Sequence, residues 1–195
     1  MKTVLALGNP GARYRDTRHN AGWWLADRFR SAWSLPPFQA STPAMRTQGV
    51  CGAETMRILK PLTYVNRSGQ VLTALNAKQG DLDPVRDLLV VVDDVWLEPG
   101  EFRFRRQGSS GGHNGLESVE QALDSQEYAR LRIGVGRPQD SRIDLAAWVL
   151  APLLPADEEA VIAAFDEMVK GTECWLADGI AAAMDRFNRR GKREG

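Results

Sequence analysis

Short apolar runs alternate along the chain with longer segments in which apolar residues recur at helical spacing. Residues 3–7 and 88–92 are nearly continuous apolar runs, which is typical of strands that are covered on both faces. Two short runs on either side of a turn, residues 49–52 and 55–59, predict a hairpin. The remaining predicted strands are residues 101–105 and 129–135.

Helices are predicted where apolar residues gather on one face and a turn signal ends the pattern. Residues 20–33 carry large apolar side chains at near-helical spacing and stop before Pro36. The other predicted helices are residues 68–78, which Gly80 ends, residues 116–123, and one or two closing helices within residues 157–185. The polar, turn-rich stretch 38–48 is expected to be a loop.

The alternation of strands and helices predicts the α/β class. We expect a three-layer sandwich, in which a mixed, mostly parallel sheet carries helices on both faces. The chain has 195 residues, and because domains hold about 100–200 residues, we expect a single domain over residues 1–195. The pattern contains no internal repeat and no clear linker.

The charge balance narrows the range of functions. Lys and Arg number 25 and Asp and Glu number 25, so the net charge is zero, which excludes a wholly basic nucleic-acid coat protein. The balance conceals two opposed regions: residues 186–195 hold five basic and one acidic residue, whereas residues 154–185 hold eight acids and only Lys170. The basic tail is expected to be flexible and to assist binding of an anionic partner.

Cysteine usage and hydropathy exclude several further classes of protein. The chain has only Cys51 and Cys174, far apart, which excludes a disulfide-dense secreted scaffold and a four-cysteine zinc site. No stretch approaches the roughly 18 apolar residues of a membrane span, and the N-terminal run is too short for a signal-peptide core. We therefore expect a cytoplasmic protein without a membrane partner.

Three polar loops follow predicted strands, which is where chemistry usually lies in an open α/β sheet. The first loop contains His19, the second contains Asp93, and the third, the glycine-rich stretch 108–115, contains His113. A carboxylate at a strand end can hold an imidazole in one tautomer and increase its basicity. The sequence alone does not say which of the two histidines Asp93 meets.

Two features of these loops allow more than one interpretation. The glycine-rich stretch 108–115 is either an anion cradle at a helix start or a plain tight turn, and it matches neither a P-loop nor a dinucleotide fingerprint. Asparagines in or beside the loops either cap helices and turns or recognise peptide groups with their amides. These asparagines are Asn9, Asn20, Asn66 and Asn114.

Taken together, the loops resemble bacterial peptidyl-tRNA hydrolase over nearly the whole chain. The most specific matches are TRHNAG and GGHNGL, which occur in one chain in this order. The matching segments are LGNPGARYRDTRHNAG (7–22), PLTYVNRSG (61–69), VVDDVWLEPGEFRFR (91–105), GSSGGHNGLESV (108–119) and RLRIGVGRP (130–138).

The resemblance implies a monomeric enzyme that cleaves the ester between a peptide and the 3′ ribose of tRNA, with no metal and no cofactor. Matched motif by motif, the resemblance implies that His19 is the general base and that Asp93 orients and polarises this base. It also implies that Asn9 distinguishes N-blocked peptidyl-tRNA from free aminoacyl-tRNA. His113 becomes a loop-organising residue. The implied contacts to substrate and tRNA are Tyr14, Tyr64, Asn66, Asn114, Arg103, Arg105 and Arg132.

The chain departs from the family pattern at Trp96, where an acid is common, and at Val65, where methionine is common. Neither departure falls on the implied base or its carboxylate, but Trp96 can reshape a groove wall. Two rival functions stay open at this point. One is a non-catalytic RNA-binding relative with the same fold, and the other is a small-molecule phosphate-binding protein that uses the stretch 108–115.

Overall fold

The computed structural model describes residues 1–79 and 82–188 and contains one seven-stranded sheet, with strand order β2-β3-β4-β1-β5-β7-β6. The four central strands run parallel, and the strands at the two edges pair antiparallel. The central strands are β1 (Lys2–Ala6), β4 (Glu54–Pro61), β5 (Leu88–Asp94) and β7 (Ala129–Gly134). The edge strands are β2 (Gln39–Ser41), β3 (Ala44–Cys51) and β6 (Phe102–Arg105).

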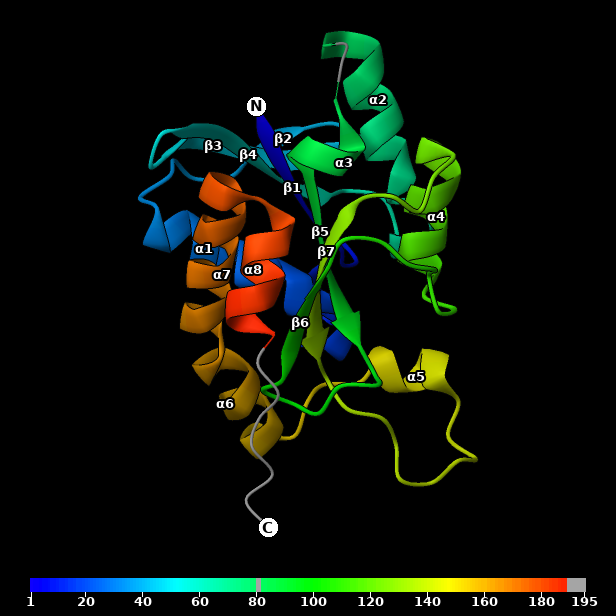
Figure 1. The fold of residues 1–195 in the computed structure, drawn as a ribbon. Helices are drawn as coiled ribbons and strands as arrows, with labels where there is room; N and C mark the ends of the chain where they lie inside the picture. Colours follow the sequence, from blue (N-terminus) through cyan, green and yellow to red (C-terminus); the bar gives the residue numbers. More distant parts are fainter. Residues whose placement is uncertain (80–81, 189–195) are drawn as a thin grey trace.

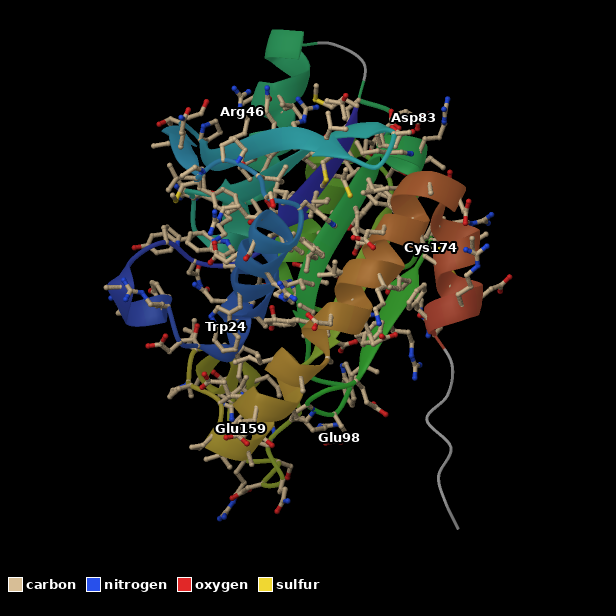
Figure 2. The ribbon with its side chains drawn as sticks, turned by 90° about the vertical axis from the view of Figure 1, so that its left-hand side faces the viewer. Trp24, Arg46, Asp83, Glu98, Glu159 and Cys174 are labelled. Atoms are coloured by element: carbon tan, nitrogen blue, oxygen red, sulfur yellow. The ribbon has the colours of Figure 1, made fainter. Side chains whose placement is uncertain are left out.

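Helices cover both faces of this sheet, which confirms the predicted three-layer α/β sandwich (Figure 1). One layer consists of α1 (Ala21–Ala32), α7 (Phe165–Asp178) and α8 (Ile180–Phe187). Figure 2 looks onto this layer, with α1 and α7 in front of the strands. The opposite layer consists of α2 (Gly69–Gln79) and α4 (Asn114–Leu123).

The continuous apolar runs of β1 and β5 supply both layers of core. In β1, Val4 and Ala6 belong to the core beneath α1 and α7, whereas Leu5 belongs to the core beneath α2 and α4. Successive strand residues point to opposite faces, so a strand between two helical layers needs an apolar residue at every position. The same alternation places Val91 in the first core and Val90 in the second.

The prediction of a loop over residues 38–48 is wrong. Residues 39–41 form β2, and β3 begins at Ala44 and pairs with β4 over its whole length. The predicted hairpin exists, but its first strand is longer than the apolar pattern indicated. These strands lie at a sheet edge and are largely half-buried or exposed, so they carry polar residues without the alternation that marks a strand.

Three short or divided helical regions also differ from the prediction. The structure adds α3 (Pro84–Asp87) and α5 (Leu145–Val149), both too short to show helical periodicity. Residues 157–185 belong to three helices rather than one or two: α6 (Pro155–Ala163), α7 and α8. Gly179, with φ of 84°, separates α7 from α8.

Two predictions fall on residues outside the described part of the chain. The first is the predicted end of α2 at Gly80. The second is the role of the basic tail residues within 189–193. None of the helices within residues 1–79 and 82–188 has both the length and the apolar character needed to cross a membrane.

Candidate active site

The loops that leave the carboxyl ends of the parallel strands enclose a cavity of about 510 Å³. Asn9 follows β1, Tyr64 follows β4 and Asp93 lies at the end of β5. Because parallel strands end at the same edge of a sheet, segments far apart in sequence meet there. Ten residues have a catalytic, substrate-binding or tRNA-binding role implied by the resemblance, and the cavity brings together eight of them: Asn9, Tyr14, His19, Tyr64, Asn66, Asp93, Asn114 and Arg132.

Both histidines of the chain converge on Asp93. Nδ1 of His19 lies 2.8 Å from Oδ1 of Asp93, and Nε2 of His113 lies 3.0 Å from the same oxygen. The two rings are neighbours, with centroids 4.9 Å apart. The structure therefore answers the question that the sequence left open, since Asp93 meets both imidazoles.

The hydrogen bonds assign a tautomer to each ring. Nδ1 of His113 accepts from the backbone N–H groups of Gly115 and Leu116, at 3.1 and 3.3 Å, so the proton of the neutral ring is on Nε2 and points at Asp93. His19 donates from Nδ1 to the same carboxylate, so its Nε2 carries the lone pair. Nε2 of His19 has no hydrogen-bond partner within the described residues and is available as a base.

The environment makes His19 more basic. Burial lowers the pKa of His19, but the charge of Asp93 and its hydrogen bond raise the pKa by more, so it lies above the ordinary value of 6.5. For Asp93, burial raises the pKa, but the two neighbouring imidazoles outweigh burial and hold the pKa far below its usual range. Asp93 is therefore an anion at neutral pH and favours the imidazolium form of His19.

The cluster of His19, Asp93 and His113 also has the composition of a metal site, with ligand atoms within 4.8 Å of one another. The tautomer of His113 argues against that use. A metal on Nε2 would displace the proton to Nδ1, where the ring already accepts two backbone hydrogen bonds from the start of α4. The arrangement suits proton transfer better than metal binding.

His113 is the N-cap of α4, as expected for a loop-organising residue. Its ring occupies the backbone N–H groups that would otherwise attract an anion at a helix start. Gly115 fits tightly beneath it, because a Cβ there would lie 2.7 Å from Cγ2 of Val65 and 3.0 Å from Cε1 of His113. The glycine-rich stretch thus anchors the histidine, which weighs against the phosphate-cradle interpretation.

A close approach of α1 to the sheet places His19 beside Asp93. His19 lies in the 3₁₀ turn η2 (Arg18–Asn20), directly before α1. A Cβ on Gly22 would lie 2.7 Å from the carbonyl oxygen of Leu7 and 3.1 Å from that of Val91. Only glycine allows this contact, so the first turn of α1 rests on the ends of β1 and β5.

Arg18 ties the same turn to the wall of the cavity that α5 forms. Its Nη1 donates to the carbonyl oxygens of Trp148, Ala151 and Pro152, at 3.4, 3.2 and 2.7 Å. The guanidinium stacks on the ring of Trp148, 3.6 Å from its centroid, and the residue is only 2% exposed. This role is not visible in the sequence, because the partners of Arg18 lie 130 to 134 residues away along the chain.

Asn9 is held so that its amide nitrogen faces the cavity. Its Oδ1 accepts from the backbone N–H of Val65 at 2.9 Å, and its own backbone N–H and carbonyl both bond to the side chain of Asn20, at 2.8 and 3.0 Å. Nδ2 of Asn9 has no partner within the described residues. The side chain is therefore a fixed donor beside His19, and Asn20 is its support, which the sequence did not indicate.

Four further residues singled out from the sequence form the polar rim of the cavity: Tyr14, Tyr64, Asn66 and Asn114. The rings of Tyr14 and Tyr64 meet edge to face, with centroids 6.2 Å apart. The amides of Asn66 and Asn114 are exposed and make no hydrogen bond within the described part of the chain. Each is free to bind a substrate.

Four arginines stand in two opposed pairs on β6 and β7. Arg103 lies opposite Arg132, and Arg105 lies opposite Arg130, so all four share one face of the sheet. Nε of Arg132 lies 2.9 Å from Oδ2 of Asp94, and the buried Arg130 reaches an acid on α4. Arg103 and Arg105 form no ion pair within the described residues, and they lie outside the cavity lining.

The phenylalanines between these arginines face the other way, as alternation along a strand predicts. Phe104 is fully buried in the core beneath α7 and α8, and Phe102 packs against that core. Burial of the two rings thus fixes which face of β6 carries Arg103 and Arg105. Among the tail residues that are described, Arg186 is paired with Asp178 at 2.7 Å.

Comparison with known proteins gives a consistent result. Residues 3–194 match the family model described as peptidyl-tRNA hydrolase. The chain is 46% identical over 189 residues to the peptidyl-tRNA hydrolase of Symbiobacterium thermophilum, covering 96% of this chain and 98% of the relative. It is 41% identical over 193 residues to that of Gemmatimonas aurantiaca, covering 97% of this chain and 100% of the relative.

Solved structures agree with the sequence relatives. The crystal structure of peptidyl-tRNA hydrolase from Acinetobacter baumannii has a TM-score of 0.87 at 27% identity, covering 96% of this chain and 94% of the other. A peptidyl-tRNA hydrolase in complex with N-propanol has a TM-score of 0.88 at 26% identity, covering 98% and 96% of the two chains.

Proposed function

Because this chain belongs to the peptidyl-tRNA hydrolase family, its substrate is peptidyl-tRNA, and we propose that His19 is its general base and Asp93 the residue that orients that base. The bond cleaved is the ester between the peptide and the 3′ ribose of tRNA. The observation that carries the assignment is the 2.8 Å contact between Nδ1 of His19 and Oδ1 of Asp93. It leaves Nε2 of His19 as the free lone pair in the cavity.

An ester is suited to this site because its alkoxide leaves far more readily than an amine, so an activated water suffices. Nε2 of His19 removes a proton from water while the water oxygen bonds to the ester carbonyl carbon. The tetrahedral intermediate then expels the 3′ oxygen of the ribose, which takes the proton back from the imidazolium. A positioned base of this kind contributes about 10²–10⁴-fold to the rate.

Asp93 stabilises the imidazolium that exists between these two proton transfers. It does so as an anion, since its pKa is far below the usual range. The developing oxyanion needs a donor, and one such donor is typically worth about 2.7–4 kcal/mol. Asn9, Asn66 and Asn114 all line the cavity, and their side-chain amides supply donors for the oxyanion or the peptide.

We assign the arginine face to the tRNA backbone. Two like charges directly opposite in a sheet are destabilising unless an anion lies between them. Arg103 faces Arg132 across the β6–β7 ladder, and Asp94 neutralises only one of this pair. A phosphate close to Arg103 and Arg105 would neutralise the positive charge that remains on this face. A chain of zero net charge would thus have a local site for an anion.

The test is hydrolysis of N-acetyl-aminoacyl-tRNA by the wild-type protein and by His19→Ala. We expect turnover by the wild type, and loss of at least about 100-fold in the variant with little change in tRNA binding. Retention of more than about a tenth of the wild-type rate would refute the role of His19. Wild-type binding without turnover would instead indicate a non-catalytic RNA-binding protein.

Two further expectations concern the state of the protein rather than its chemistry. We propose that it acts as a monomer and in the cytoplasm. Sedimentation of the free protein and of its tRNA complex would reveal a larger assembly.

A further inference from the structure

One side of the cavity is an apolar wall that contains no group used in the chemistry above. It combines the loop after β5 with α5 and the residue that follows it. Three of its large side chains are well exposed: Trp96 at 62%, Leu150 at 43% and Leu145 at 39%. The wall consists of Val95, Trp96, Leu145, Ala146, Val149 and Leu150.

Exposed apolar side chains that gather along a cavity are typical of a binding surface. This wall is also firmly built. The backbone N–H of Trp96 donates to Oδ1 of Asp94 at 2.9 Å, and the N–H of Gly136 donates to the carbonyl of Leu97 at 3.0 Å. Nε1 of Trp148 in α5 donates to the carbonyl of Gly136 at 2.8 Å. Three separate segments are thus joined, and Figure 1 shows α5 at the lower right beside them.

Arg137 places a positive charge against the Trp96 ring of this wall, although Arg137 itself does not line the cavity. Its guanidinium lies 4.2 Å from the centroid of the Trp96 ring, within the range of a cation–π contact. Arg137 is exposed and forms no ion pair within residues 1–79 and 82–188. A ligand at Trp96 therefore contacts an apolar ring and lies within the electrostatic reach of an unneutralised cation.

We propose that Trp96 and α5 bind the side chain of the amino acid esterified to tRNA, and that Arg137 disfavours cationic side chains there. The proposal rests on the proposed function and specifies which peptidyl-tRNAs this site prefers. Apolar side chains gain binding free energy here, because their surface is removed from water when it packs against the wall. Lysine and arginine side chains are repelled by Arg137, while a side chain as small as that of glycine gains nothing.

The terminal base of tRNA is the other possible occupant of the wall. The wall is mainly aliphatic and, apart from Trp96, offers neither a flat ring nor hydrogen-bonding side chains for the edge of a base. The polar rim, with the rings of Tyr14 and Tyr64 and the amides of Asn66 and Asn114, has both. These features favour the peptide side chain at Trp96.

The experiment compares N-acetyl-Phe, N-acetyl-Gly and N-acetyl-Lys esters on one tRNA body, so that only the side chain differs. For the wild type, kcat/KM should be about tenfold higher for Phe than for Gly, and lowest for Lys. Trp96→Ala should abolish the preference for Phe over Gly while the Gly ester is cleaved as before. Trp96→Phe, which keeps a ring, should retain most of the preference.

Arg137→Ala should raise kcat/KM for the Lys ester several-fold and leave the Gly ester unchanged. Arg142→Ala is the matched control, because Arg142 is an exposed arginine nearby that is paired with Asp140. Trp24→Ala is the control for loss of a tryptophan, since Trp24 lies on α1 outside the cavity lining (Figure 2). Both controls should keep the wild-type order of substrates.

An equal loss on all three esters in Trp96→Ala would overturn the proposal and assign Trp96 to the tRNA base. Equal wild-type cleavage of all three esters would also overturn it, while leaving the proposed hydrolysis intact. Failure of the wild type to cleave any of the three esters would refute the proposed function and this inference with it.

Discussion

His19 and His113 donate hydrogen bonds to the same oxygen atom, Oδ1 of Asp93, at 2.8 and 3.0 Å. Within the described residues, the other carboxylate oxygen, Oδ2, is buried without a hydrogen-bond partner. A single atom thus links the turn before α1 to the start of α4. Because both rings share one anion, a change at either one alters the field that the other experiences.

Asp93→Asn should shift the acid limb of the pH–rate profile to lower pH and reduce the maximal rate. His19 acts as a base when neutral, so wild-type kcat/KM should fall as the pH drops through a pKa above 6.5. Without the carboxylate charge only burial remains, and burial lowers the pKa of His19. NMR titration of the His19 ring would check the shift, with Asp166→Asn, an exposed acid on α7, as control. An unchanged titration would exclude Asp93 from this role.

His113→Ala should lower the stability of the fold and shift the acid limb of the pH–rate profile to higher pH. The variant loses the N-cap of α4, which costs about 0.5–2 kcal/mol of unfolding free energy. It also leaves Asp93 to interact with His19 alone, so the pKa of His19 should rise. His113→Asn should recover the cap, and with it the melting temperature, but not the contact with Asp93. If Asn also restored the wild-type pH profile, His113 would have no electrostatic role.

Arg18→Ala should impair both folding stability and turnover. The carbonyl oxygens of Trp148 and Ala151 keep backbone N–H donors, but within the described residues that of Pro152 loses its donor. A buried group left without a partner costs about 1–3 kcal/mol. Arg18→Lys should recover little, because an ammonium cannot reproduce the planar guanidinium stacked on Trp148. Arg28→Ala is the matched control, since Arg28 pairs with Asp166 at the surface and should contribute at most about 1 kcal/mol. Melting temperatures and kcat would separate the two arginines.

Replacing Arg103 and Arg105 together by Ala should raise KM for intact peptidyl-tRNA and flatten its salt dependence. Each lost phosphate contact should reduce the slope of log affinity against log salt by roughly 0.7–0.9. A peptide esterified to a short 3′ fragment should be cleaved nearly as before, because it does not reach β6. Equal weakening of both substrates, or an unchanged salt slope, would show that these arginines do not hold tRNA.

Asn9→Asp should reduce the discrimination between N-acetylated and free aminoacyl-tRNA. The aspartate keeps an acceptor for the backbone N–H of Val65 but replaces the Nδ2 donor that faces the cavity. Loss of one hydrogen bond is worth about 0.5–1.5 kcal/mol, so the ratio of kcat/KM values should fall up to about tenfold. Rates should be measured on the pH plateau. Equal loss on both substrates would contradict this role for Asn9.

The apolar pattern was sufficient to identify the central elements. The strands β1, β5 and β7 and the helices α1, α2 and α4 occur within a few residues of their predicted bounds. A buried central strand must be apolar at every position, and a helix that covers the sheet must be apolar on one face. Both patterns can be recognised directly in the sequence. The acid at the end of β5 and two candidate histidines were likewise visible, because residue type and position in the loops suggest a base and its partner. The choice of His19 as the base came from the family resemblance of its motif.

Tertiary structure decided what depends on contacts between distant segments. The polar edge strands β2 and β3 are stabilised by pairing rather than by a pattern of their own. The clamp of Arg18 on Trp148, the support of Asn9 by Asn20 and the apolar wall at Trp96 are also set by such contacts. The sequence could propose His19 and His113 as separate candidates, but only the folded chain brings both rings to one oxygen of Asp93, because that contact requires three loops to meet at one edge of the sheet.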